Sequence, residues 1–570
     1  MAYLLRRAVD DASRLALLLP GSTGFEGRRW GELADDVWKY AGWLARCGVR
    51  CGDRVAQVSE NRYEWLLSDL AILALGAVHV PLHTSLSTAQ LVDQLAHSQP
   101  RLVLASPATQ PLVTAALQQR ARPDGSSPAI ELQINTAARQ AGEAAAELRQ
   151  QGRDLAAQTI ARDDHPTLAT ILYTSGALGE PRGVMLSHGN LIADTVGILQ
   201  AFGENPCERR LCFLPLSHIY ARTCDLYVWL VAGTEMVLAA SPASVLSTAQ
   251  ETHPTFINGV PFFYERLVAG LAESLRDRGG HRSPGILRAA LGQQIEQCSC
   301  GGAAVSAELV DYFQEQQVHL LPGYGLSEAA PVVTASTPRQ SRRGTVGRPL
   351  PNVEVRIAAD GEILVRGPQV MLGYYRDEQQ TSVVTRDGWL HTGDIGELDE
   401  AGYLTISGRR KEIIATKQGK KIPPLPLEAQ LAALTLIDQV MVIGDERDYL
   451  IALVVPDLSA AAALFGGAAD SSADSSLTAA EWSLEQACCR VELQQAIAAQ
   501  IATAQRPAAR HERIRKVALV ADRFTVENGL LTSKLTLRRA LIAARHAPAI
   551  EAMYANDRAV SAWLEIPSCE

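Results

Sequence analysis

The feature that most constrains the fold of this 570-residue chain is a recurring alternation of short apolar runs with longer helical stretches. The apolar runs include RLVLAS, ATILYTSG, RLCFLPLS, TEMVLA, TFINGV and HLLPGYG. Residues 30–49 carry an apolar stripe at helical spacing, formed by Leu33, Val37, Ala41 and Leu44. Alternation of this kind predicts parallel strands joined by helices, which is an α/β architecture.

After about residue 340 the chain changes to short strands and tight turns. Residues 353–367, VEVRIAADGEILVRG, read as strand, Asp360-Gly361 turn and strand, which indicates a β-hairpin. From Arg409 a smaller α+β segment follows, and residues 439–457 indicate a second hairpin within it.

These changes predict two domains. We expect a large N-terminal lobe of several subdomains over residues 1–408, with parallel-rich sheets, helices and a β-hairpin region. A small α+β C-terminal domain is expected over residues 409–570, with an Ala/Ser-rich insertion near residues 458–480. Residues 137–162, rich in alanine and glutamine, predict a surface helix or a second insertion.

The composition excludes several classes of protein. With 47% hydrophobic and 20% charged residues the chain is typical of globular proteins, and its net charge of -9 argues against a nucleic-acid partner. The most apolar stretch, residues 66–82, contains Asp69, His79 and Pro81, which favours a buried helix running into a strand over a membrane span. The chain starts without a secretory signal, and its 10 cysteines show no zinc-type pairing. We expect a cytoplasmic protein with reduced thiols and at most peripheral membrane contact.

The segment ILYTSGALGEPRGVMLSHGNL, residues 171–191, is the first candidate for a binding site. An apolar strand leads into a glycine-rich loop, and Ser-His-Gly-Asn then opens a helix-like segment. Glycines let backbone N–H groups close around phosphate oxygens, while hydroxyls and an arginine add donors and positive charge. The loop lacks the Gly-Lys-Ser/Thr ending of a Walker-type loop, so a plain surface turn is an equal alternative on this segment alone. The candidate phosphate-binding residues are Thr174, Ser175, Gly176, Gly179, Arg182 and Gly183.

Further segments follow in a definite order along the chain. They are LPLSHIYAR (214–222), GGAAV (301–305), GYGLSEAAPVVT (323–334), GTVGRPLPN (344–352), GWLHTGDIG (388–396) and ISGRRKEIIATKQGKKIPPLPLE (406–428). Together with the glycine-rich loop, this series resembles the adenylate-forming superfamily of acyl-CoA synthetases, luciferases and peptide-synthetase adenylation domains. The segments SENRYEW, GVPFFYERL and ENGLLTSKLTLRRALI are most similar to the long-chain fatty acyl-CoA synthetases. The resemblance covers nearly the whole chain.

The resemblance implies an AMP-forming ligase that makes a carbon–sulfur bond. A medium- or long-chain fatty acid would attack the α-phosphate of ATP, pyrophosphate would leave, and the acyl group would pass from acyl-AMP to coenzyme A. ATP, Mg²⁺ and coenzyme A are the implied cofactors and co-substrates, and the C-terminal domain would move between the two half-reactions. Two alternatives stay open: an acyl-AMP ligase that loads an acyl carrier protein, and a degenerate relative that binds nucleotide or acyl ligand without catalysis.

The same resemblance implies which residues surround the nucleotide. Tyr324 would stack on the adenine beside the Gly302-Ala303 backbone, with a core aromatic as the alternative. Asp394 would accept hydrogen bonds from the ribose with support from Arg409, or would cap a local turn instead. The implied set in this part of the chain is Gly302, Ala303, Tyr324, Gly325, Ser327, Asp394 and Arg409.

Four further residues are implied in metal binding, catalysis and domain movement. Glu328 would hold Mg²⁺, because a hard cation that bridges phosphates prefers a carboxylate oxygen; a solvated acid is the alternative. His218 would lie near the carboxylate and the acyl entrance, although a lone histidine is often structural. Lys411 matches the hinge position, or is a solvated charge in a basic run, and the loop at Gly419 would approach the thiol tunnel.

The glycine-rich loop departs from the family pattern Thr-Ser-Gly-Thr-Thr-Gly-x-Pro-Lys-Gly. Ala177 and Leu178 stand where hydroxyl residues are usual. A lost hydrogen bond to a charged group costs about 1.5–3 kcal/mol, or about tenfold to a hundredfold in rate. Arg182 replaces lysine and keeps the charge with a different geometry. We expect a weakened loop that still binds phosphate.

The catalytic lysine is the second departure. The long-chain branch typically reads Leu-Thr-Pro-Thr-Leu-Lys-Leu, and a gapless match puts Thr536 at the lysine position. The wider pattern Gly-Lys-Leu-x-x-Arg fits SKLTLR and makes Lys534 the catalytic residue instead. Side chains two positions apart in an extended loop point the same way, so we predict that Lys534 bridges carboxylate and phosphate.

Overall fold

The chain forms two compact units in a computed structural model. The structure describes residues 2–120, 130–133, 145–161, 167–175, 181–203, 209–276, 285–465, 483–525, 528–531, 536–556 and 563–567. The large unit comprises Met1–Ala358, Ile363–Thr392 and Leu398–Thr405, and the small unit comprises Ala359–Glu362, Gly393–Glu397 and Ile406–Glu570. The sequence did not predict that Ala359–Glu362 and Gly393–Glu397 belong to the small unit. The predicted domain boundary at residue 409 stays a prediction.

The first sheet of the large unit has parallel strands at its centre and antiparallel strands at both edges. Its order is β15 (Arg348–Pro349), β14 (Val332–Ala335), β13 (His319–Gly325), β12 (Gln297–Cys300), β11 (Phe256–Gly259), β9 (Arg209–Cys212), β10 (Glu235–Leu238), β1 (Leu15–Gly21) and β2 (Gly24–Arg29). The run from β9 to β13 therefore presents its carboxyl ends along one edge, the side on which open α/β sheets bind ligands.

The second sheet carries the strand that leads into the glycine-rich loop. Its order is β18 (Gly373–Tyr374), β8 (Pro181–Ser187), β7 (Leu168–Ser175), β4 (Val78–Leu82), β3 (Arg54–Val58), β5 (Leu102–Ala105) and β6 (Ile130–Gln133). Strands β3, β4, β5, β6 and β7 are parallel, and β8 and β18 add antiparallel pairs. Helices α4 (Thr88–Ser98) and α5 (Gln110–Arg120) contribute Leu91, Leu95 and Val113 to the core against this sheet, which explains the continuous apolar runs of its strands.

Strands between residues 354 and 409 form a third sheet. It is ordered β16 (Glu354–Ile357), β17 (Glu362–Arg366), β20 (Trp389–Leu398) and β19 (Thr385–Arg386), with β21 (Leu404–Arg409) against β20. The helices and helical turns among the described residues up to 384, apart from α4 and α5, are α1 (Ala2–Asp10), α2 (Trp30–Arg46), α3 (Tyr63–Ala74), α7 (Ala145–Ala161), α8 (His188–Phe202), α9 (Ile219–Ala221), η1 (Arg222–Tyr227), α10 (Val228–Ala232), η2 (Pro242–Ser244), α11 (Val245–Thr252), α12 (Pro261–Arg276), α13 (Ile286–Ala290), α14 (Ala307–Glu315), η3 (Ser327–Ala329) and α15 (Glu378–Val384).

The small unit is built on a four-stranded sheet with a core on each face. Its order is β24 (Ile437–Ile443), β25 (Leu450–Pro456), β26 (Ile514–Leu519) and β27 (Leu564–Glu565), beside the short pair β22 (Ile414–Ala415) and β23 (Lys421–Ile422). Alternate residues of β25 face different cores: Leu450, Ala452 and Val454 belong to one, and Ile451, Leu453 and Val455 to the other. The helical elements of this unit are η4 (Arg410–Glu412), α16 (Pro424–Ala432), α17 (Leu458–Phe465), α18 (Leu484–Cys488), α19 (Val491–Ala504), α20 (Arg539–Arg545) and α21 (Ala547–Ala555).

Several predicted elements are confirmed. The stripe in residues 30–49 is helix α2, residues 66–82 run from α3 into β4, and both predicted hairpins form, as β16–β17 and β24–β25. The α/β class is confirmed by the fold. The predicted insertion near 458–480 begins as helix α17, and its residues 466–480 lie outside the described part of the chain. No described helix has the length and apolar character needed to cross a membrane. All cysteines in the described ranges are free thiols.

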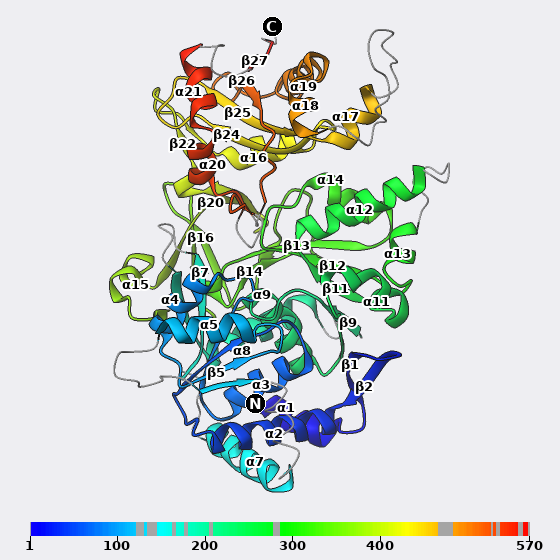
Figure 1. Cartoon of the computed structure of the whole chain (residues 1–570), viewed down its shortest axis with the longest axis vertical. Helices are drawn as coiled ribbons and strands as arrows, with labels where there is room; N and C mark the ends of the chain where they lie inside the picture. Colours follow the sequence, from blue (N-terminus) through cyan, green and yellow to red (C-terminus); the bar gives the residue numbers. More distant parts are fainter. Residues whose placement is uncertain are drawn as a thin grey trace. The chain divides into compact units, whose positions relative to one another are not determined.

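Helix α7 falls within the alanine-rich region predicted as a surface helix or insertion, and it packs one face against α2 (Figure 1). The two helices meet through a reciprocal pair of glycines. A Cβ atom on Gly152 would lie 2.0 Å from the carbonyl oxygen of Trp38, and one on Gly42 would lie 2.1 Å from that of Leu148. Because both neighbours are backbone atoms, neither helix can approach this closely with a side chain at these positions.

We expect Gly152→Ala to destabilise the large unit. The added methyl group must push α7 away from α2, and overpacking of this kind lowers the free energy of unfolding by about 1–3 kcal/mol. Gly270→Ala in helix α12 is the matched control, because a Cβ atom there has nothing within 4 Å. The control should raise stability by about 0.4–1 kcal/mol. Denaturant unfolding followed by circular dichroism measures both, and equal effects would contradict the packing argument.

Candidate functional site

The glycine-rich segment is the turn of an antiparallel hairpin. Strand β7 pairs with β8 so that Thr174 lies opposite Arg182 and Tyr173 opposite Gly183. The helix predicted from Ser-His-Gly-Asn is confirmed, because Ser187 caps α8 and the helix starts at His188, but the strand β8 before it was not predicted. Gly176, Gly179, Ala177 and Leu178 lie outside the described residues, as does the side chain of Ser175. Thr174 and Arg182 are thus the described polar side chains at the base of this loop.

Two features bring a distant segment onto strand β8. The Gly183 carbonyl accepts a hydrogen bond from the Tyr375 backbone N–H at 2.7 Å, and a Cβ atom on Gly183 would lie 3.3 Å from Cβ of Tyr375. Asn190, in the first turn of α8, donates to the carbonyls of Pro368 and Val370 at 2.7 and 2.9 Å. Strand β18 is therefore held against β8, with Tyr374 opposite Val184.

Tyr374 joins the phosphate-binding candidate Arg182 to the metal-binding candidate Glu328. The Arg182 guanidinium lies 5.5 Å from the centre of the Tyr374 ring, and the Tyr374 hydroxyl donates to Oε1 of Glu328 at 2.9 Å. Burial and the Glu328 carboxylate raise the pKa of Tyr374, so the phenol stays protonated and keeps donating at neutral pH. Tyr374 was not predicted from the sequence, where its local signal is limited to its place after glycine in MLGYYRD.

Glu328 has the chemistry of a magnesium ligand. One of its oxygens accepts the Tyr374 hydrogen bond, and a carboxylate offers further lone pairs for a hard cation. Protein-bound Mg²⁺ usually takes one or two carboxylates, with water and substrate phosphates completing its octahedron. The described residues contain no group of three or more acidic, histidine or cysteine side chains placed to hold a metal ion by themselves.

The adenine candidates lie on the strand and turn that also carry Glu328. Tyr324 is near the end of β13 and pairs with Thr334 of β14. The next residue, Gly325, cannot bear a side chain, because a Cβ atom would lie 1.9 Å from the Pro331 carbonyl oxygen. Ser327, which is buried, then begins the turn η3 with Glu328 as its second residue.

Gly302 and Ala303 follow β12, the parallel neighbour of β13, so they lie at the same edge of the first sheet as Tyr324. Gly302 has a φ of +86°, a conformation that glycine adopts without strain. At its neighbour Gly301 a Cβ atom would lie 3.2 Å from the ring of Tyr220, which leaves little room for a side chain. These two strand ends bring together the residues assigned to the adenine.

His218 occupies the position immediately before α9 and lies against a second histidine. The ring centres of His218 and His83 are 4.0 Å apart, and His83 Nδ1 is 2.8 Å from the hydroxyl of Ser217. His83 follows the end of β4, so the second sheet also contributes to this corner of the large unit. The sequence analysis did not single out His83, which has no motif around it.

The ribose candidates lie in the small unit. Nε of Arg409 is 3.2 Å from Oδ1 of Asp394, whose side chain is only 7% exposed, whereas that of Arg409 is 67% exposed. An ion pair with so exposed a partner contributes little stability, so the pair is better suited to orienting the carboxylate. Lys411 is in the turn η4 immediately after β21.

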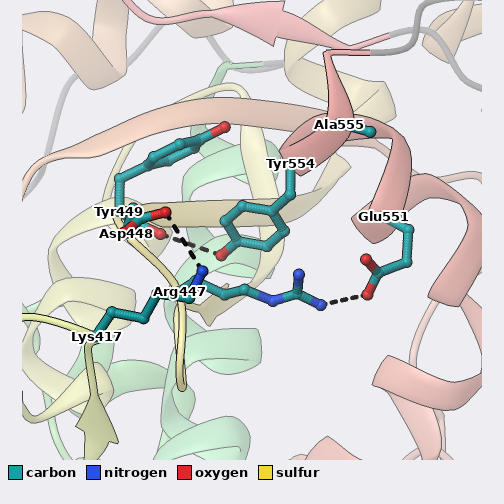
Figure 2. A pocket seen from close by; sticks show the side chains of 7 residues that line it. All are labelled: Lys417, Arg447, Asp448, Tyr449, Glu551, Tyr554 and Ala555. Carbon is teal, nitrogen blue, oxygen red and sulfur yellow. Dashed lines mark hydrogen bonds and ion pairs between the residues drawn. The ribbon is translucent and has the colours of Figure 1, made fainter.

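Gly419 lies in the turn between β22 and β23, with a φ of +75°. A cavity of about 330 Å³ adjoins this turn and is lined by Lys417, Arg447, Asp448, Tyr449, Glu551, Tyr554 and Ala555 (Figure 2). The Lys417 backbone N–H donates to the Arg447 carbonyl at 3.0 Å, and Arg447 pairs with Glu551. The cations that line the cavity are thus matched by acids, and its walls support the turn that carries Gly419.

Both candidate positions for the catalytic lysine, 534 and 536, fall between Leu531 and Leu537. Leu531 and Leu537 form an antiparallel bridge, and the Arg538 backbone N–H donates to the Leu530 carbonyl at 2.9 Å. Thr536 is exposed beside this bridge, and Lys534 lies outside the described residues. The loop closed by the bridge contains both candidates, and the choice of Lys534 stays a prediction.

Comparison with known proteins matches the AMP-binding enzyme family over residues 10–375 and the AMP-binding enzyme C-terminal domain over residues 411–558. The chain is 32% identical to the long-chain-fatty-acid–CoA ligase FadD15 of Mycobacterium tuberculosis, over 92% of each chain. It is 28% identical to the peroxisomal long chain acyl-CoA synthetase 7 of Arabidopsis thaliana, over 95% of this chain and 83% of that protein.

Solved structures with the same fold include ATP-bound MatB from Rhodopseudomonas palustris, with a TM-score of 0.71, 24% identity and coverage of 96% of this chain and 99% of that one. The O-succinylbenzoate coenzyme A synthetase MenE of Bacillus subtilis, in complex with ATP and magnesium, has a TM-score of 0.69 at 22% identity, over 94% and 98% of the two chains.

Proposed function

Since the chain belongs to the AMP-binding enzyme family, we propose that it is an AMP-forming ligase that joins a long-chain fatty acid to coenzyme A. The names of its relatives support this substrate class, because ligases and synthetases of long-chain acids match over most of the chain. ATP supplies the free energy, and AMP and pyrophosphate are the by-products.

The reaction has two steps that both involve the carboxyl group of the acid. A carboxylate oxygen attacks the α-phosphorus of ATP, the bond to pyrophosphate breaks, and acyl-AMP forms. The sulfur of coenzyme A then attacks the acyl carbon, AMP leaves with the electron pair of the broken C–O bond, and the thiol proton is lost to solvent. Both steps proceed through added negative charge on oxygen, so they depend on positioning and on charge stabilisation.

The large unit would bind the triphosphate and the acid. We propose that Thr174 and Arg182 neutralise the phosphates and that Tyr324 stacks on the adenine. His218 would orient the carboxylate of the fatty acid. Glu328 would hold Mg²⁺, which when bound would offset the charge of the phosphate oxygens.

The small unit would supply the remaining groups. Asp394, oriented by Arg409, would bind the ribose, and Lys534 would bridge the carboxylate and the phosphate during adenylation. Lys411 would act as the hinge, and the turn at Gly419 would meet the incoming thiol.

The cytoplasmic location and the peripheral membrane contact expected from the sequence also stay proposals.

The observation that best supports this function is that Arg182 and Glu328 both contact Tyr374. Tyr374 and Glu328 are 46 residues apart in the chain. A cation for phosphate and a carboxylate for a divalent metal are the two groups that Mg·ATP requires. Ala177 and Leu178 favour a second candidate, a degenerate relative that binds nucleotide without catalysis.

Exchange of labelled pyrophosphate into ATP is the decisive assay. We expect the purified chain to catalyse this exchange only when a long-chain fatty acid is present, because the exchange requires reversible acyl-AMP formation. Absence of exchange with every chain length would favour the degenerate relative. Thioester formation is then measured with coenzyme A and, separately, with an acyl carrier protein bearing phosphopantetheine. A product only with the carrier would identify the acceptor as protein.

A further inference from the structure

A single turn of π-helix, η1, lies buried beneath the elements assigned to ATP. It follows α9 directly, and each of its residues from Arg222 to Tyr227 is buried. Its backbone is tied to the candidate His218, whose carbonyl accepts from the Arg222 backbone N–H at 3.0 Å. Such turns are rare in proteins and are found most often near functional sites.

Arg222 connects this turn to the strand that leads into the phosphate loop. Its Nη1 donates to Oγ1 of Thr170 on β7 at 2.8 Å, and its Nη2 donates to the buried carboxylate of Asp69 at 2.5 Å. Asp69 also accepts from Tyr227 at 3.0 Å and lies 2.6 Å from Nδ1 of His79. Burial alone would raise the pKa of Asp69, but Arg222 and His79 outweigh it and lower that pKa. The arginine is therefore held by a buried, ionised partner.

Thr223, the next residue, connects the same turn to Glu328. Its hydroxyl donates to the carbonyl oxygen of Ala330 at 2.9 Å, within the buried interior. Ala330 ends the short helical turn that carries Glu328 and has a φ of +66°. A residue with a side chain is disfavoured in this left-handed conformation, which persists only where the surroundings hold it. The Thr223 hydroxyl is one such restraint.

Asp225 connects the turn to the first sheet. It accepts a hydrogen bond from Asn258 at the end of β11, and Asn258 accepts one from Ser299 on β12. Ser299 in turn lies 2.9 Å from the hydroxyl of Tyr220, the ring beside Gly301. One buried turn thus contacts the strand before the phosphate loop, the turn that carries Glu328 and the strands beside the adenine candidates.

We propose that Thr223 is a positioning residue for Glu328, which it holds at a fixed place relative to the phosphate-binding strand β7 through the Ala330 carbonyl. The proposal rests on the proposed role of Glu328 as the magnesium ligand. Arg222 binds Thr170 on β7, and Thr223 binds the Ala330 carbonyl beside Glu328. Loss of the Thr223 hydroxyl should therefore allow the turn that carries Glu328 to move while β7 stays in place.

The test measures how strongly magnesium tightens ATP binding. The dissociation constant of ATP is determined by calorimetry with and without Mg²⁺, in the absence of fatty acid, for the wild type, Thr223→Val and Thr223→Ser. Valine has nearly the shape of threonine without the hydroxyl, whereas serine keeps it. We expect Thr223→Val to reduce the tightening by magnesium about fivefold, the scale of one lost hydrogen bond, and Thr223→Ser to restore it.

Thr109→Val is the matched control, because the Thr109 hydroxyl also donates from a buried position to a backbone carbonyl, that of Val58, but away from the candidate site. A general loss of stability would affect both variants alike, so a fall in the magnesium effect in both would overturn the proposal. So would an unchanged magnesium effect in Thr223→Val. If Thr223→Val does not fold, Thr223→Ala, which also lacks the hydroxyl, takes its place. A wild type that binds no ATP would instead contradict the proposed function.

Discussion

Replacing Lys534 by alanine is expected to lower fatty-acid-dependent pyrophosphate exchange by about a hundredfold to a thousandfold, the usual cost of removing one donor that stabilises charge in a transition state. The second half-reaction should be nearly unaffected, because the bridge between carboxylate and phosphate is needed only while acyl-AMP forms. Exchange of labelled pyrophosphate measures the first step, and thioester formation from synthetic acyl-AMP and coenzyme A measures the second.

Thr536→Ala is the control for this prediction. Thr536 occupies the lysine position in the gapless match and belongs to the same loop, closed by the bridge between Leu531 and Leu537. The Thr536→Ala variant should retain at least half of the wild-type exchange rate, because the neutral hydroxyl that it loses cannot act as an ammonium group between two anions. If Lys534→Ala exchanges at the full rate, Lys534 is not the catalytic lysine.

The second large effect is expected for Glu328→Gln. Removing the negative charge while keeping the side-chain length should lower pyrophosphate exchange by about a hundredfold, since hydrogen bonds and contacts to charged groups are worth about 1.5–3 kcal/mol each. Glutamine retains an oxygen that can accept from the Tyr374 hydroxyl, which donates to Glu328 at 2.9 Å, so the local fold should survive. Raising the Mg²⁺ concentration should recover part of the lost rate.

Glu308→Gln tests whether the loss is specific. Glu308, in the first turn of α14, has a side chain that is 70% exposed and lies 3.6 Å from Arg343. The same change of charge there should leave the exchange rate and its magnesium dependence as in the wild type. A magnesium dependence in Glu328→Gln that matches the wild type would show that Glu328 does not hold the metal.

The elements that the sequence predicted correctly have local signals. Helix α2 shows its apolar stripe within a few turns, and the hairpin β16–β17 is marked by Asp360-Gly361, where Gly361 adopts a φ of +85°. Strand β8 was missed because PRGVMLS starts with proline and contains glycine, which locally indicate a turn. Its pairing with β7 overrides that tendency.

The candidate site was predictable only as far as its motifs extend. The segments that resemble a known family contain Thr174, Arg182, Tyr324 and Glu328. Each of these segments can be identified from its own residues without knowledge of the fold. Tyr374 and Thr223 have no such signal, because their roles arise from contacts with Glu328 and Ala330 that lie 46 and 107 residues away in the chain. Contacts at this separation follow from topology, which no local pattern encodes.

The antiparallel register of β7 and β8 also determines which changes the family can accept between these strands. Ser175 and Pro181 are paired, so the two ends of the intervening segment keep their separation whatever side chains it contains. Substitutions such as those at positions 177 and 178 therefore leave Thr174 and Arg182 where they are. A shift of this pairing by one residue would instead turn the side chains of one strand to the opposite face. Homologous chains should thus preserve the register of these two strands while the composition of the loop between them diverges.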